Sequence, residues 1–178
     1  MKNRRLTSLS AAAALFATTF AHAETVVIEA AQYLDVVQGR LVAPAVIVVE
    51  GEKIAAINPA TRPANARTID LGGQTLLPGL MDSHTHLNYD IVEGWETEPV
   101  RFTAGDYALR GTVDARKPLL AGFTTVRDLG TGLGFSDVAL QRAIDQGWVI
   151  GPRMIPAGHA LSITGGHCDL TGFGPGIE

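Results

Sequence analysis

Two histidines, His84 and His86, stand one residue apart just after an apolar run that begins at Leu76. On an extended strand, side chains at positions i and i+2 point to the same face. Both imidazoles can then reach one cation, and imidazole nitrogen is a common ligand of zinc, copper, iron and nickel. The spacing therefore predicts a metal site at the carboxyl end of a strand. On the tripeptide alone, a chance pair of solvated histidines is the alternative.

Two further polar residues are candidates for the same site. Asp82 precedes His84 by two residues and shares its face of the strand, so it either orients a metal ligand or is an ordinary polar residue at the strand end. His167 lies in the glycine-rich segment 164–169, and glycines let a backbone approach a ligand closely. We regard His167 as a candidate for ligand contact, with a solvated loop histidine as the alternative.

Arg127 and Asp128 end a second predicted strand and must face opposite sides of it because they are adjacent. One of them would point inward while the other caps the following loop. A structural ion pair is the alternative to a chemical role for these two residues.

The elements that position these residues change character near residue 74. Residues 24–74 are rich in β-branched residues and turn signals, which favours a small β-rich domain with a structural role. Three segments are typical of strands: residues 25–28, 45–50 and 53–57. A turn at residues 51–53 would join the last two as a hairpin, and Gly39 marks another turn between short strands.

Residues 75–178 alternate between strand-like and helix-like patterns. Strands are predicted at residues 75–82, 123–128 and 153–157, and helices at 104–121 and 136–146. The first helix offers Leu109, Val113, Leu119 and Leu120 for burial, and Ser136 is the expected N-cap of the second. This alternation predicts an α/β fold with parallel strands, and polar groups after each strand are typical of a (β/α)₈ TIM-type barrel. Such a barrel needs about 250 residues, so we expect an N-terminal fragment with about three βα units.

The first 23 residues have the three parts of a secretory signal peptide. These are a basic start with Lys2, Arg4 and Arg5, an apolar stretch at residues 9–20, and the small-x-small sequence at residues 21–23. A membrane anchor would need about 20 apolar residues. We therefore expect cleavage after Ala23 and an exported protein, periplasmic or secreted, with no membrane span after cleavage.

Cleavage would remove three of the 14 basic residues and none of the 18 acidic residues, so the formal net charge would change from −4 to −7. Nucleic-acid binding is not expected of an acidic chain without a basic stripe. Cys168 is the only cysteine, which excludes an internal disulfide.

Three motifs occur in order along the chain: residues 76–87 (LLPGLMDSHTHL), residues 121–130 (AGFTTVRDLG), and the paired segments 151–154 and 162–167. They resemble the first three barrel strands and a following loop of the metal-dependent amidohydrolase superfamily, in its imidazolonepropionase-like and Xaa-Pro dipeptidase-like branch. Residues 24–74 are similar to the N-terminal part of the small composite β-sandwich that such enzymes carry beside the barrel. The resemblance covers the whole chain after residue 23.

The resemblance implies a site for two divalent ions, usually zinc, with His84 and His86 on the more buried one. It also implies a substrate contact for His167. The other family ligands, a bridging carboxylated lysine and two histidines, and the aspartate that serves as general base would come from strands beyond residue 178. We therefore expect no catalytic residue within this stretch, and no catalysis by this stretch alone.

The implied activity is hydrolysis of a C–N bond in a small substrate such as a dipeptide. An imidazolone or cyclic-amide hydrolase is the alternative within enzymes, and a non-catalytic truncated remnant or binding protein is the alternative from another class. The expected partner is a small molecule or peptide. Assembly into a homo-oligomer is left open.

Overall fold

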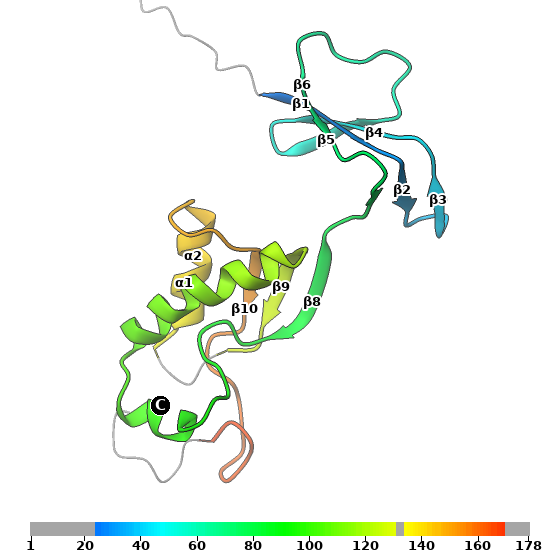
Figure 1. The fold of residues 1–178 in the computed structure, drawn as a ribbon. Coiled ribbons are helices and arrows are strands. Elements are labelled where there is room, and N and C mark those ends of the chain that lie inside the picture. Colours follow the sequence, from blue (N-terminus) through cyan, green and yellow to red (C-terminus); the bar gives the residue numbers. More distant parts are fainter. Residues whose placement is uncertain (1–23, 131–133, 170–178) are drawn as a thin grey trace, which may run out of the picture. The chain divides into compact units, whose positions relative to one another are not determined.

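The computed structural model describes residues 24–130 and 134–169, so the predicted signal peptide, residues 1–23, lies outside the described residues. The chain has an α/β fold and divides into two compact units between Leu77 and Pro78. Each unit is described by itself (Figure 1). Within the described ranges, no helix is long and apolar enough to cross a membrane.

The first unit consists of two small sheets. One has the order β5-β4-β1-β6, with β1 at Thr25–Ala30, β4 at Ala45–Glu50, β5 at Lys53–Ile57 and β6 at Arg67–Asp70. The other has the order β3-β2-β7, with β2 at Gln32–Asp35, β3 at Arg40–Val42 and β7 at Thr75–Leu76. The antiparallel pairing of β4 with β5 confirms the predicted hairpin. Val27, Ile47 and Val48 are buried, which gives this unit an apolar interior of β-branched residues.

The second unit alternates strands and helices. It contains β8 (Leu80–Thr85), the 3₁₀ helix η1 (Trp95–Val100), α1 (Ala104–Leu120), β9 (Phe123–Asp128), α2 (Ser136–Asp145) and β10 (Arg153–Pro156). The strands form a sheet of order β10-β9-β8, and both pairings are parallel, as predicted. Figure 1 shows α1 and α2 side by side along this sheet, and buried Ala115, Val126 and Leu140 form the core between them. Because the strands are parallel, the residues that follow β8, β9 and β10 gather at one edge.

The strand predicted at residues 75–82 is in fact two strands. β7 pairs with β2 in the first unit, whereas β8 begins at Leu80 and continues to Thr85, beyond the predicted end. Pro78 lacks a backbone N–H, and Gly79 lies so close to Thr124 that a Cβ would fall 1.9 Å from its Oγ1. The extension of β8 places His84 inside the strand and His86 directly after it.

Helix α1 buries a different face from the one predicted. Its buried residues are Tyr107, Gly111 and Ala115. Of the four predicted residues, Leu119 is half-buried and Leu109, Val113 and Leu120 are exposed. The large apolar side chains do not determine which face of α1 is buried. Gly111 and Ala115 are buried instead, because small residues allow neighbouring side chains to approach the helix axis. The start of the helix is fixed by a capping box in which Thr103 and Asp106 exchange hydrogen bonds between side chain and backbone.

The predicted N-cap Ser136 is instead the first residue of α2. The N-cap is Phe135, which has a left-handed conformation (φ 54°) and whose ring contacts the ring of His159 with centroids 4.3 Å apart. Ser136 and Asp137 are buried inside the first turn. The chain therefore enters α2 through a backbone turn, which the pattern of capping residues does not indicate.

We predict that Gly111→Ala destabilises the protein although alanine favours helices. A Cβ at residue 111 would lie 2.8 Å from both Asn88 Nδ2 and Leu140 Cδ2, and both side chains are buried. Overpacking typically costs about 1–3 kcal/mol, against a gain of at most about 1 kcal/mol in helix propensity. The thermal unfolding midpoint should therefore fall.

The control for this prediction is Gly105→Ala in the first turn of the same helix. A Cβ there would meet only Thr103 Oγ1 at 3.5 Å, an ordinary contact. This variant should keep or slightly raise the unfolding midpoint. Equal effects of the two substitutions would contradict the packing argument.

Candidate functional site

The two histidines of the predicted metal site lie together at the carboxyl end of β8. Their ring centroids are 5.4 Å apart, and the ring planes meet at 73°. His84 is exposed and His86 is half-buried. The rings are thus close enough to serve one ion, with His86 on the more protected side.

A hydrogen bond fixes the tautomer of His86. The Nδ1 atom of its ring lies 3.0 Å from the carbonyl oxygen of Gly130, which follows β9. Because a carbonyl oxygen only accepts, Nδ1 carries the hydrogen, and the Nε2 lone pair of the neutral ring stays available. Ligand histidines in metal sites generally have such a partner on their second nitrogen.

Asp82 contacts the main chain of His84 and not its ring. Its Oδ1 accepts a hydrogen bond from the backbone N–H of His84 at 3.0 Å. This bond lies where the register between β8 and β9 shifts, between Asp82 and Thr85. Asp82 thus stabilises the local backbone that carries the first histidine.

Asp128 is fully buried, whereas its neighbour Arg127 is exposed, and within the described residues the two form no ion pair. The carboxylate of Asp128 accepts the backbone N–H of Leu87 at 2.7 Å and that of Gly130 at 3.0 Å. Burial raises the pKa of Asp128 above its usual value, and the two hydrogen bonds partly oppose this rise. The inward residue of this pair therefore links the loops that follow β8 and β9.

Tyr89 packs against the second histidine of the pair. Its ring lies 4.9 Å from the ring of His86, centroid to centroid. Burial raises the pKa of Tyr89 first, and the charges of Asp128 and Cys168 raise it further. His167 is exposed.

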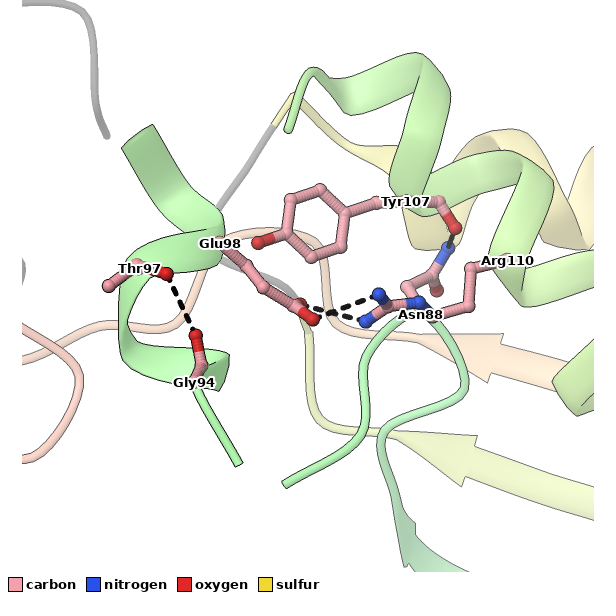
Figure 2. Close-up of polar contacts among 6 residues, drawn as sticks. All are labelled: Asn88, Gly94, Thr97, Glu98, Tyr107 and Arg110. Atoms are coloured by element: carbon pink, nitrogen blue, oxygen red, sulfur yellow. Dashed lines mark hydrogen bonds and ion pairs between the residues drawn. The ribbon is translucent and has the colours of Figure 1, made fainter. Parts of the chain in front are cut away.

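The segment between β8 and α1 is held by several polar contacts (Figure 2). Asn88 is fully buried and donates from Nδ2 to the carbonyl oxygen of Tyr107 at 3.3 Å. Figure 2 shows the carboxylate of Glu98 in η1 facing the guanidinium of Arg110 in α1, with two hydrogen bonds of 2.7 and 2.9 Å. These largely buried charges form a bidentate pair, which is the stronger geometry for such contacts. The residues after His86 are therefore fixed to α1.

The donor set suits a divalent transition metal but is incomplete within the described ranges. Residues 24–130 and 134–169 contain no group of three or more His, Cys, Asp or Glu side chains arranged to hold an ion. The nitrogen donors of His84 and His86, one with its tautomer fixed, fit two positions of a zinc-type site.

A family comparison matches this part of the chain. The model of the amidohydrolase family aligns with residues 75–171, which include both histidines and all three parallel strands. The chain belongs to the amidohydrolase family. The predicted family is therefore confirmed.

Relatives of this amidohydrolase-family chain have several named activities. Ochratoxinase of Aspergillus niger is 38% identical over 101 residues, which are 53% of this chain and 19% of that protein. Imidazolonepropionase of Arthrobacter sp. (strain FB24) is 49% identical over 49 residues, which are 27% of this chain and 12% of that protein. The structure of a Xaa-Pro dipeptidase with methionine bound in its active site has a TM-score of 0.75 and 30% identity, over 87% of this chain and 38% of that one. The chain thus spans well under half the length of these relatives.

The structure also shows two neighbours of His86 that sequence reasoning missed. Tyr89 and Gly130 contact His86, one through its ring and the other through its carbonyl oxygen. Tyr89 lies close to the histidine pair in the sequence, so the sequence could have indicated this contact. Gly130 lies 44 residues from His86, and no local pattern connects the two.

Proposed function

We propose that the full-length protein is a metal-dependent hydrolase of C–N bonds in small amides or peptides such as dipeptides. The observation that carries this proposal is the paired rings of His84 and His86, with Nδ1 of His86 bound to Gly130 and Nε2 left available. Members of the amidohydrolase family generally use divalent metals. The similarity to a Xaa-Pro dipeptidase over most of this chain supports a dipeptide as substrate.

Each residue of the site has a distinct part in this proposal. His84 and His86 would hold a divalent ion, which supplies an activated water and polarises the substrate carbonyl when bound. The bond to Gly130 would hold the ring of His86 in this orientation, and the ring of Tyr89 packs against it. His167 would contact the substrate from the loop after β10. The carboxylate of Asp82 would keep the backbone of His84 in place.

We further propose that this unit is the first part of a (β/α)₈ barrel, and that the first unit belongs to a β-sandwich. The parallel order β10-β9-β8 with intervening helices supports the barrel. In the full-length protein, two zinc ions, a bridging carboxylated lysine and an aspartate as general base would complete the site.

Export of the protein, proposed from residues 1–23, favours scavenged peptides as substrates over an intracellular intermediate. An imidazolone or other cyclic amide is the second candidate, because the match to imidazolonepropionase reaches 49% identity over its short range. The two candidates differ in whether the broken bond lies in a ring.

The test is an assay of the full-length protein, with measured metal content, on two substrate panels. One panel contains Xaa-Pro and other dipeptides, and the other contains imidazolones and other cyclic amides. We expect hydrolysis of dipeptides that is lost with a chelator and restored by Zn²⁺. Metal-dependent turnover of cyclic amides alone would select the second candidate, and bound metal without turnover on either panel would favour a binding protein.

A further inference from the structure

The side chain of Asp128 bonds to the main chain at two places next to His86. The N–H that Leu87 donates to its carboxylate belongs to the peptide directly after His86. The N–H that Gly130 donates belongs to the same residue whose carbonyl oxygen accepts from the His86 ring. One buried carboxylate thus fixes both the backbone of His86 and the acceptor of its ring.

The neighbouring backbone leaves this arrangement little freedom. Leu129 donates to the carbonyl of Thr85 at 2.9 Å, and Ala157 donates to the carbonyl of Asp128 at 3.0 Å. Asp128 therefore sits where the ends of β8, β9 and β10 are joined. A hydrogen bond that an anion accepts is about twice as strong as one between neutral groups. A carboxylate that accepts two such bonds therefore holds the two backbone segments firmly in place.

We propose that Asp128 is a positioning residue for His86, which orients the imidazole toward the metal through Leu87 and Gly130. This inference rests on the proposed function, since it assumes that His86 binds metal. Outer partners of ligand histidines fix the tautomer and ring orientation, and their loss typically costs roughly 10- to 100-fold in metal affinity or activity. Asp128 does not bond to the ring of His86 itself. It bonds to Leu87, the next residue, and to Gly130, which accepts from the ring.

Asp137 provides a matched control. Its carboxylate is also fully buried and also accepts a backbone N–H, from Gly158 at 2.8 Å. Within the described residues, its other oxygen, Oδ1, has no hydrogen-bond partner. Asparagine at residue 137 can keep the single bond through its amide oxygen. Asparagine at residue 128 cannot keep both, because its Nδ2 is only a donor and would face an N–H.

The experiment compares Asp128→Asn with Asp137→Asn in the full-length protein by two measurements. Nitrogen-15 NMR of the metal-free protein gives the tautomer of His86, and competition with a chromophoric chelator gives the affinity for Zn²⁺. In wild type and Asp137→Asn, His86 should be protonated at Nδ1. In Asp128→Asn we expect a mixture of tautomers and Zn²⁺ binding weaker by roughly 10- to 100-fold.

Wild-type affinity and tautomer in Asp128→Asn would overturn the proposal, as would equal losses in Asp137→Asn. If Asp128→Asn does not fold, Asp128→Glu keeps both oxygens on a longer arm and should show a smaller loss of the same kind. Loss of native circular dichroism in both variants would assign Asp128 to the fold alone and overturn the proposal. Wild-type Zn²⁺ affinity in His86→Asn would instead refute the proposed metal site, and the NMR comparison would still decide the role of Asp128.

Discussion

Replacing His84 with asparagine is expected to abolish bound metal and turnover together, with little change in the thermal unfolding midpoint. The ring of His84 is exposed, and within the described residues its side chain contacts the ring of His86 and enters no hydrogen bond. Exposed substitutions of this kind usually change stability by about 0.5 kcal/mol or less. Loss of a direct ligand should exceed the roughly 10- to 100-fold effect of an outer partner. Metal content by elemental analysis and turnover on the same sample measure both effects.

The matched control is His159→Asn. His159 is also exposed and also makes an edge-to-face contact with one aromatic ring, that of Phe135, at the start of α2. This variant should retain metal and activity. Normal metal stoichiometry in His84→Asn would remove His84 from the ligands, and equal metal loss in both variants would indicate a general disturbance.

The parallel βαβ order was predictable from sequence because it depends on local patterns. Strand β9 was predicted with its observed bounds, and α1 begins at the predicted residue 104. The buried face of α1 was not predictable in this way. Hydrophobicity favours burial of Leu109 and Val113, but Gly111 and Ala115 are buried because Asn88 and Leu140 approach the helix there. The buried face therefore depends on the residues that pack against α1 and not on α1 itself.

The histidine pair of the candidate site was also accessible to sequence reasoning, since the i, i+2 spacing alone puts two side chains on one face. The supporting contacts were not. Gly130 and Asp128 reach His86 and Leu87 across the pairing of β8 with β9, more than 40 residues away along the chain. A single sequence carries no signal for which backbone carbonyl will accept from a ring nitrogen. The spacing in the sequence thus indicates the candidate ligands, whereas only the fold shows how they are oriented.

Gly130→Ala is expected to weaken both the fold and Zn²⁺ binding. Gly130 has φ +96°, which side chains rarely adopt, and a Cβ there would lie 2.2 Å from the carbonyl oxygen of Gly158. Backbone strain costs about 1–3 kcal/mol and overpacking a similar amount, so we expect a loss of roughly 2–6 kcal/mol in the free energy of unfolding. Any shift of residue 130 also moves the carbonyl that accepts from His86. Thermal unfolding and Zn²⁺ competition measure the two consequences.

Gly122→Ala separates the backbone strain from the contact. Gly122 follows α1 with φ +98°, almost the same angle, but a Cβ there would have nothing within 4 Å. This variant should lose only the strain, about 1–3 kcal/mol, and should bind Zn²⁺ as wild type does. If the two alanine variants lost the same stability and both kept wild-type affinity, the contact with Gly158 would be unimportant. The difference in Zn²⁺ affinity between the two variants therefore measures how far the close approach of Gly130 to the Gly158 backbone determines the orientation of His86.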